Sequence, residues 1–297
     1  MKLARKGLWA ERITDQHSLT RLEQHIADTG ANLLCIRSES PYIEKLVKEL
    51  QPKGVRVYVW RWPNLIPGLP PDAQYWKNEL AIAQKLIAAG IDGYVFDIES
   101  DDGIDDPKHN HQPYAHDWDN PNVADRVQQA TTFATGISNA FIARKKPYVL
   151  GLTSHQRGFS NYPHIPWKPF LDVCNILFPQ TYWRADGSKT ATKACHGVSY
   201  DYSVDPPHRV GTPDQAVLNA FEDYANKKNA KGVILPIIPI AGEIGCIKAG
   251  EIAHFGTLVA QRGLTEAHFY VDVDKPGWAE GPPQGDDPQV LTDIKAL

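Results

Sequence analysis

Cysteine is scarce in this sequence, which has only four cysteines among 297 residues and no C-x-x-C pair. No histidine stands at zinc-finger spacing from any of Cys35, Cys174, Cys195 and Cys246. A metal site or a dithiol redox motif is therefore not expected, and buried, unreactive thiols are the favoured interpretation. A disulfide stays open as the alternative, because Cys195 and Cys246 both fall in segments expected to be loops.

An excess of charge of one sign is also lacking. The net charge is −4, the isoelectric point is about 6.3, and no run of Lys or Arg suggests attachment to an anionic membrane surface. This excludes the basic surface with which proteins bind nucleic acid or an anionic membrane. We expect a small or uncharged partner, and a monomer.

Long hydrophobic runs are absent as well. No stretch approaches the roughly 18 apolar residues of a membrane span, and the richest one, residues 233–241, contains Pro236 and Pro239. The basic start, residues 1–12, loses its apolar run at Glu11, short of the roughly 7–15 residues of a signal-peptide core. We expect a soluble chain made in the cytoplasm without a targeting segment, and leave open its release or delivery to a cell wall.

A repeated junction organises the sequence. Five times, a helix-like segment ends at a glycine, and an apolar, β-branched or aromatic run begins within a few residues. Glycine suits this place because helices commonly close through a left-handed residue. The short continuous runs are typical of parallel strands that are buried on both faces. The five glycines are Gly30, Gly54, Gly90, Gly232 and Gly263, and their runs are residues 32–36, 55–60, 94–96, 233–235 and 268–271.

The segments between these runs have helical periodicity, as in Trp76, Leu80, Ala83 and Ile87, which predicts buried stripes rather than a cofactor site. Residues 6–10, 148–152 and 175–180 complete eight strands, each followed by a helical stretch, the last over 288–297. This count predicts a single (β/α)8 TIM barrel, an α/β fold, over residues 1–297. An open doubly wound sheet is the alternative, but no G-x-G-x-x-G or G-x-x-x-x-G-K-[ST] motif follows a strand to favour a nucleotide.

In a TIM barrel the catalytic residues lie just after the strands, at one rim. The residues at these places are rich in carboxylates, which supply acids, bases and nucleophiles, and in aromatics, which suit the apolar faces of sugar rings. We select Trp62 and Trp183 for stacking on a sugar. The full set of candidates is Arg61, Trp62, Asp97, Glu99, His155, Gln180, Tyr182, Trp183, Glu243, Asp272 and Asp274.

Asp97 and Glu99 are the central pair. Alternate residues of a strand share a face and lie about 6–7 Å apart, so these two side chains point the same way. Two carboxylates this close oppose each other's ionisation, and one of them can stay protonated as a general acid near neutral pH. At the end of a buried barrel strand, a catalytic role is favoured over a merely solvated pair.

The sequence around this pair resembles a known family. Residues 92–99, DGYVFDIE, are similar to the D-G-x-D-x-D-x-E motif on strand 4 of family 18 glycoside hydrolases, which are chitinases and endo-β-N-acetylglucosaminidases. Residues 178–183, FPQTYW, resemble the strand-6 segment of that family, with Gln or Met before Tyr. More distantly, family 25 lysozymes also present Asp-x-Glu after an apolar strand. The resemblance covers two short motifs and the alternation of strands and helices that is typical of a barrel.

The resemblance implies a role for each matching residue. Glu99 would protonate the glycosidic oxygen, and Asp97 would assist the substrate's 2-acetamido group, whose carbonyl oxygen attacks the anomeric carbon. Tyr182 would hold that carbonyl and Gln180 would hydrogen-bond the sugar. Val95 stands where the family has its middle Asp. The group that tunes the pKa of Asp97 is therefore supplied by another residue or is absent.

These residues predict a glycoside hydrolase that acts on β-linked, N-acetylated glycan of the peptidoglycan or chitin type. No cofactor is expected, and Arg61, His155, Glu243 and Asp272 are further expected substrate contacts. One alternative is a non-catalytic glycan-binding barrel, which the loss of the Asp at Val95 favours. Another is a retaining glycosidase with Glu99 as acid and Glu243 as nucleophile, about 5–5.5 Å apart. In a third, Asp272 and Asp274 supply the base of an inverting enzyme.

The longest expected loop, residues 100–122, directly follows Glu99. A lid or a wall of sugar subsites is natural there, since long loops in compact domains are commonly functional. The loop carries His109, His111 and His116 beside Asp117, and a metal-assisted hydrolase would use them. Their spacing matches no known metal site, so solvated histidines are favoured and no metal is predicted.

Overall fold

The computed structural model describes residues 2–11, 13–64, 73–100, 118–185, 197–200, 209–210, 212–242, 247, 250–271 and 288–297. The strands are β1 (Arg5–Ala10), β2 (Leu33–Arg37), β3 (Arg56–Arg61), β4 (Gly93–Asp97), β5 (Val149–His155), β6 (Ile176–Thr181), β7 (Arg184–Ala185), β8 (Gly197–Tyr200), β9 (Arg209–Val210), β10 (Ile240–Ala241) and β11 (Glu266–Val271). The helices are α1 (Gln16–Thr29), α2 (Ile43–Leu50), the short 3-10 helix η1 (Gln51–Lys53), α3 (Gln74–Ala89), α4 (Arg126–Arg144), α5 (Gly158–Asn161), α6 (Trp167–Val173), α7 (Pro213–Tyr224), α8 (Glu251–Gln261) and α9 (Pro288–Ala296).

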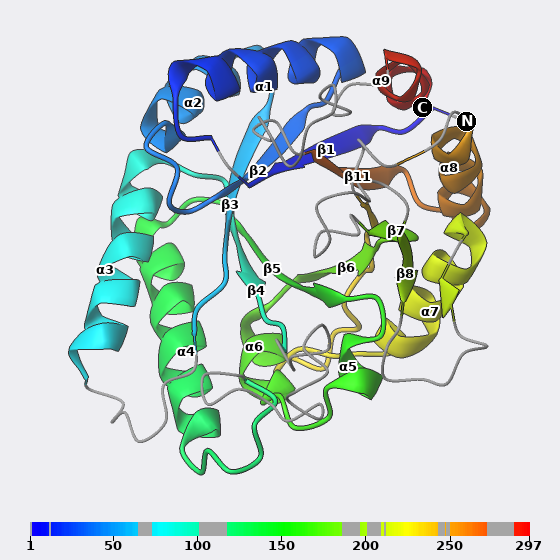
Figure 1. Ribbon diagram of the computed structural model, residues 1–297. Helices are drawn as coiled ribbons and strands as arrows, with labels where there is room; N and C mark the ends of the chain where they lie inside the picture. Colours follow the sequence, from blue (N-terminus) through cyan, green and yellow to red (C-terminus); the bar gives the residue numbers. More distant parts are fainter. Residues whose placement is uncertain are drawn as a thin grey trace. The chain divides into compact units, whose positions relative to one another are not determined.

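Eight of the strands form a closed barrel in the order β1-β11-β10-β6-β5-β4-β3-β2, as Figure 1 shows. The predicted (β/α)8 barrel is therefore confirmed, and the open-sheet alternative is excluded. A small antiparallel sheet, β7-β8-β9, was not expected from the sequence. In a closed parallel barrel the C-terminal ends of all strands lie at one rim, which is where sequence reasoning expected the site.

Chain contacts divide the molecule into two compact units. Unit 1 comprises Met1–Tyr58, Gln180–Glu222 and Ile238–Leu297. Unit 2 comprises Val59–Pro179 and Asp223–Ile237.

Unit 1 has a buried polar chain inside the β1–β11 ladder. The Trp9 indole N–H donates to His268 Nδ1 at 2.9 Å, and the other ring nitrogen of His268 lies 3.0 Å from Glu266, which also binds Arg5. The donor at Nδ1 fixes the neutral tautomer with its proton on Nε2. A Cβ at Gly7 would lie 2.5 Å from the His268 ring, so only glycine fits beside it.

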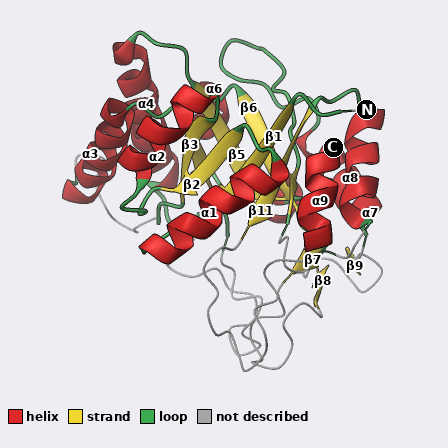
Figure 2. Cartoon of the chain, turned by 90° about the horizontal axis from the view of Figure 1, so that it is seen from above, coloured by secondary structure: helices red, strands yellow, loops and turns green. Residues whose placement is uncertain are grey.

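Helices α8 and α9 lie beside β11 and β1 in the same unit, as seen in Figure 2. Lys6 in β1 donates through its ammonium group to the carbonyls of Ile294 and Lys295 at 3.1 and 3.0 Å. These carbonyls at a helix C-terminus lack intrahelical partners, and a cation is favourable there. The strand and the last helix are thus tied together by one buried side chain.

Unit 2 is held by an aromatic core. Helices α3 and α4 lie side by side (Figure 1), and Trp76 of α3 packs 5.4 Å from Phe133 of α4. Phe96 of β4 packs on Phe133 and on Phe170 of α6. Trp118 is fully buried and donates its indole N–H to the Pro63 carbonyl at 2.7 Å. These contacts give β4 a fixed outward face of aromatic rings.

Four of the five glycine junctions are confirmed, at Gly30, Gly54, Gly90 and Gly263, each of which follows a helical segment and precedes a barrel strand. Trp76, Ala83 and Ile87 are buried on α3, as predicted. All five glycines have positive φ angles, between 65° and 100°, a conformation that costs glycine little.

The prediction of the seventh barrel strand at residues 233–235 was wrong. The barrel strand is β10, Ile240–Ala241, whereas Val233 and Ile234 are about half exposed and Ile234 makes only an antiparallel bridge to Lys228. Prolines at 236 and 239 cannot donate to a ladder, which explains why the apolar run does not form one long strand. In the sequence, Glu243 comes two positions after the end of β10, outside the described residues.

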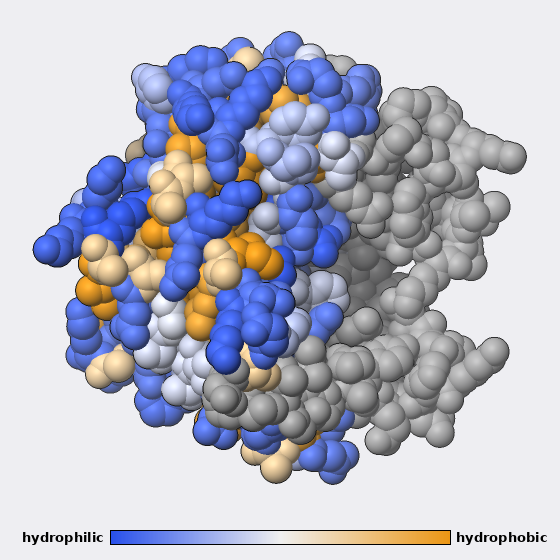
Figure 3. Space-filling view, turned by 90° about the vertical axis from the view of Figure 1, so that its left-hand side faces the viewer, coloured by the Kyte–Doolittle hydropathy of each residue, from blue (hydrophilic) through white to orange (hydrophobic). Residues whose placement is uncertain are grey.

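On the face drawn in Figure 3, the hydrophobic residues lie mostly in the middle of the described part, with hydrophilic residues around and among them. Large apolar side chains that are exposed in unit 2 include Trp62, Ile82, Val127 and Ile142. Scattered exposed apolar residues are normal on soluble proteins and do not define a docking surface. None of the described helices has the length and the apolar character that crossing a membrane requires.

Candidate active site at the end of β4

Asp97 is the last residue of β4, and Glu99 follows two residues later. The rings of Tyr94 and Phe96 lie on one side of the strand, where Phe96 meets α4 and α6. Val95 and Asp97 therefore point to the other side, into the barrel. Asp97 is 6% exposed, and the Glu99 side chain is 15% exposed. The structure thus places two largely buried carboxylates at the catalytic rim of unit 2.

His155, at the end of β5, lies next to Glu99. Its Nε2 atom is 3.9 Å from a Glu99 carboxylate oxygen, within reach of an ion pair but longer than a hydrogen bond. The Tyr224 hydroxyl donates to the His155 backbone carbonyl at 2.8 Å, and the ring of Tyr162 lies 5.4 Å from the imidazole. The neighbouring elements therefore hold His155 in place beside the predicted acid.

Tyr224 is a neutral donor at this site. Burial raises its pKa well above the usual value, and the charges of Asp223, Glu99 and Asp97 raise it further, against a lowering effect of the nearby Ser154 side chain. Asp223 accepts hydrogen bonds from the backbone N–H of Phe159 and from the Ser160 hydroxyl, which anchors α7 to α5. The carboxylates of the rim are thus backed by a phenol that keeps its proton.

Val95 belongs to an apolar layer below the carboxylates. It is fully buried and pairs across the ladder with Gly151. A Cβ at Gly151 would lie 2.6 Å from the ring of Phe178 and 3.3 Å from Val95. An Asp at position 95 would therefore put its carboxylate next to an aromatic ring, which is costly without a partner. This packing explains how the chain departs from the motif without a buried, uncompensated charge.

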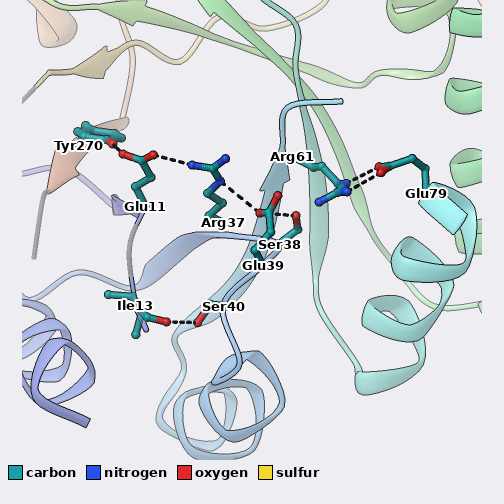
Figure 4. Close-up of polar contacts among 9 residues, drawn as sticks. All are labelled: Glu11, Ile13, Arg37, Ser38, Glu39, Ser40, Arg61, Glu79 and Tyr270. Carbon is teal, nitrogen blue, oxygen red and sulfur yellow. Dashed lines mark hydrogen bonds and ion pairs between the residues drawn. The ribbon is translucent and has the colours of Figure 1, made fainter. Parts of the chain in front are cut away.

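Arg61 and Trp62, at the end of β3, have different environments. Two nitrogens of the Arg61 guanidinium, Nε and Nη2, donate to the two carboxylate oxygens of Glu79 in α3, and the two side chains are only 12% and 6% exposed (Figure 4). Such a bidentate pair gives Arg61 a structural contact between strand and helix. Trp62 is 37% exposed, so part of its ring is accessible for stacking.

Gln180, Tyr182 and Trp183 lie in unit 1. Gln180 is in β6, in register with Ile240 of β10. The Tyr182 ring is half-buried and packs against Gly242, where a Cβ would lie only 1.8 Å from it. Trp183 is fully buried, packs 5.5 Å from Phe255 and donates to Glu251 at 3.1 Å. Burial of the whole indole favours packing for Trp183, rather than the sugar stacking that the sequence suggested.

Sequence reasoning missed a polar network at the rim of unit 1. The Glu11 carboxylate accepts hydrogen bonds from Arg37 at 2.6 Å and from the Tyr270 hydroxyl at 2.9 Å, and Arg37 also pairs with Glu39, which accepts from Ser38 (Figure 4). The Tyr270 ring lies 5.8 Å from that of Tyr182. Glu11, Arg37 and Tyr270 all stand at C-terminal ends of strands, and this position was the signal that could have found them.

Several predicted residues lie outside the part of the chain that the structure describes. They include Glu243, Asp272 and Asp274, most of the loop 100–122 with its histidines, and two of the cysteines. Cys35 and Cys174 are buried free thiols, as expected, and burial raises the pKa of Cys174 well above its usual value. Over the described residues, no three His, Cys, Asp or Glu side chains are grouped to hold a metal ion.

Comparison with known proteins gives the fold and no more. No family model matches the sequence, and no curated protein matches it either. Among solved structures, the chitinase ICChI from Ipomoea carnea is similar with a TM-score of 0.50 and 11% identity over 97% of this chain and 98% of the chitinase. A protein named for deoxyribose-phosphate aldolase, from Toxoplasma gondii ME49, has a TM-score of 0.50 and 12% identity over 99% and 94% of the two chains.

A calcium-binding mutant of beta-glucuronidase 2 from Bacteroides uniformis has a TM-score of 0.55 and 9% identity over 96% of this chain. The match spans 32% of the glucuronidase, about a third of its length. At such identities the similarity extends to the TIM-barrel fold alone, a fold that hosts unrelated chemistries. The neighbours themselves differ in function, and the choice among functions depends on the site.

Proposed function

We propose that this protein is a glycoside hydrolase that cleaves β-linked, N-acetylated glycans of the chitin or peptidoglycan type. Glu99 is the general acid, and Asp97 assists the 2-acetamido group of the substrate. The observation that carries the proposal is the placement of both carboxylates, largely buried, at the C-terminal end of β4, with His155 3.9 Å from Glu99. Residues at this end of a barrel strand are the ones that TIM-barrel enzymes use for chemistry.

The reaction follows from the two carboxylates. Glu99 gives its proton to the glycosidic oxygen while the acetamido carbonyl oxygen of the substrate attacks the anomeric carbon, so that the leaving sugar departs as an alcohol. Asp97 accepts a hydrogen bond from the acetamido N–H and stabilises the positive charge that develops on the ring so formed. Water then opens that ring and returns a proton to Glu99, which restores the enzyme.

Other predicted contacts remain part of the proposal. Trp62 offers a partly exposed ring, and Gln180 and Tyr182 keep their proposed roles toward the sugar and its acetamido carbonyl. His155 is close enough to Glu99 to contact the leaving sugar's oxygen as well. Glu243 and Asp272 are proposed only from their positions in the sequence.

A non-catalytic glycan-binding barrel is the second candidate. The apolar layer of Val95, Gly151 and Phe178 favours it, because that layer replaces a carboxylate of the family motif. The retention and burial of Glu99 favour the hydrolase. A retaining glycosidase with Glu99 as acid and Glu243 as nucleophile shares the acid with the first proposal and differs in needing no acetamido group.

The test compares wild type, Glu99→Gln and the control Glu49→Gln, whose carboxylate is exposed on α2. Each is incubated with chitin and with peptidoglycan, with and without a chelator, and new reducing ends are counted. We expect Glu99→Gln to lose at least about a hundredfold in rate, the scale of a general acid, while the control keeps its activity. Binding of the polymer without any product from wild type would favour the second candidate, and loss of activity with the chelator would indicate metal-assisted hydrolysis.

A further inference from the structure

The side chain of Thr153 is a buried polar group beside Asp97. Thr153 is fully buried in β5 and stands in register with Asp97 of β4. Its hydroxyl oxygen has no hydrogen-bond partner among the described residues. Most buried side-chain polar atoms in proteins have a partner, so an exception calls for an explanation.

Other threonines in the barrel show what a satisfied hydroxyl looks like here. Thr181, at the end of β6, is also fully buried and donates to the Ile240 carbonyl at 2.7 Å. Thr29, at the end of α1, donates to the His25 carbonyl at 2.7 Å. A valine at position 153 would have the same shape and no polar atom to bury. The threonine therefore lowers the stability of the folded protein without substrate, compared with a valine.

The backbone holds Thr153 firmly against the catalytic strand. The N–H of Ile98 donates to the Thr153 carbonyl at 3.1 Å, between the two proposed catalytic residues. Asp97 and Thr153 both point into the barrel, because Val95 and Gly151, which stand two residues earlier on the same strands and pair with each other, meet on that side. Side chains of residues paired in register on one face lie within reach of each other.

We infer that Thr153 is a positioning residue, whose hydroxyl donates to the Asp97 carboxylate in the substrate complex and aims it at the acetamido group. This inference rests on the proposed function and deepens it. It gives Asp97 the polar neighbour that the family motif supplies from position 95, where this chain has Val95. In this chain the polar neighbour of Asp97 comes from β5 instead of from position 95, because the apolar layer of Gly151 and Phe178 occupies the space around position 95.

A hydroxyl that orients a carboxylate has a stability signature that a structural hydroxyl lacks. Replacement of Thr153 by Val removes a polar atom that has no described partner, so the melting temperature stays the same or rises. The same change at Thr181 removes a hydrogen bond to a backbone carbonyl, so the melting temperature falls. Thr153→Ser keeps the hydroxyl and serves as the conservative variant.

The experiment measures kcat and KM of wild type, Thr153→Val, Thr153→Ser and Thr181→Val on a chitin hexasaccharide, together with melting temperatures. We expect Thr153→Val to lose roughly tenfold to a hundredfold in kcat/KM, the scale of one hydrogen bond to a charged group. The loss lies mainly in kcat, because Asp97 assists the attack of the acetamido oxygen. Thr153→Ser recovers most of the rate, and the folded state of Thr153→Val is at least as stable as wild type.

A binding readout separates the role toward the acetamido group from general damage. In a Glu99→Gln background, Thr153→Val weakens binding of the N-acetylated hexasaccharide and leaves binding of its fully deacetylated counterpart unchanged. Equal kcat/KM for Thr153→Val and wild type, or equal weakening for both sugars, would overturn the role of Thr153. If wild type neither cleaves nor binds the hexasaccharide, both the proposed function and the role of Thr153 are refuted. If Glu99→Gln is inactive and Thr153→Val is fully active, only the role of Thr153 is refuted.

Discussion

The ion pair between Arg61 and Glu79 provides the sharpest prediction for stability. The two side chains are 12% and 6% exposed, and the Nε and Nη2 atoms of Arg61 donate to the two carboxylate oxygens of Glu79. Glu79→Leu removes the carboxylate that pairs with the buried Arg61 guanidinium, which costs about 3–5 kcal/mol. For a chain of this length, this corresponds to a fall in melting temperature of roughly 6–10 °C, at about 2 °C per kcal/mol.

The assay is denaturant unfolding of both single variants and of the double variant Arg61→Met, Glu79→Leu. Because an apolar pair replaces a buried ion pair at little cost, we expect the double variant to recover to within about 1 kcal/mol of wild type. A Glu79→Leu variant that loses less than about 1 kcal/mol would refute a structural role for the pair, since exposed ion pairs contribute only that much. A stable double variant that no longer binds glycan would restore Arg61 to the substrate contacts.

Two further predictions concern a buried histidine and the two rim tryptophans. Burial lowers the pKa of His268, against the opposing effect of Glu266. The unfolded chain therefore binds the proton more readily than the folded protein. As a result, the free energy of unfolding falls as the pH decreases below about 6.5, the pKa of histidine in an unfolded chain. Denaturant titrations at a series of pH values check this, and a curve that is flat between pH 7.5 and 5.5 contradicts it. Trp62→Ala is expected to weaken binding of a chitin oligosaccharide about tenfold or more. Trp183→Phe removes the hydrogen bond to Glu251, so it lowers stability by about 1–3 kcal/mol and leaves binding unchanged. The opposite assignment of the two effects would show that Trp183 becomes exposed in the complex.

The barrel could be predicted because its signals are local. Each glycine that closes a helix needs a left-handed backbone, and each apolar run that follows it needs burial on both faces. Residues 233–235 show the limit of this reasoning. Their run is as apolar as a strand, but the prolines at 236 and 239 interrupt its ladder, and pairing with β6 and β11 occurs instead at Ile240 and Ala241.

The site could be predicted where it depends on a single strand. Asp97 and Glu99 are two residues apart at the end of one apolar run, and strand geometry alone aims them together. The network of Glu11, Arg37 and Tyr270 depends on three strands that are distant in the sequence, so the position of each residue at a strand end is visible but their contact with one another is not. Whether a rim residue is exposed or buried is decided by helix packing, which the sequence does not state.

The burial of Trp183 shows the same limit. Its position after β6 is the one expected for a sugar platform, yet Phe255 and Glu251 of α8 enclose its ring. The unpartnered hydroxyl of Thr153 was equally invisible, since a buried threonine and a buried valine fit the same apolar run. Both features depend on neighbours brought by tertiary packing.

The role of Glu99 as general acid is tested most directly by varying the leaving group. A substituted phenol of low pKa departs without help from an acid, whereas a sugar alcohol needs a proton. We predict that Glu99→Gln loses at least about a hundredfold in kcat/KM on a chitin hexasaccharide and much less than that on an N-acetylglucosaminide of such a phenol. Equal losses on the two substrates, or full activity of Glu99→Gln on the hexasaccharide, would contradict the assignment.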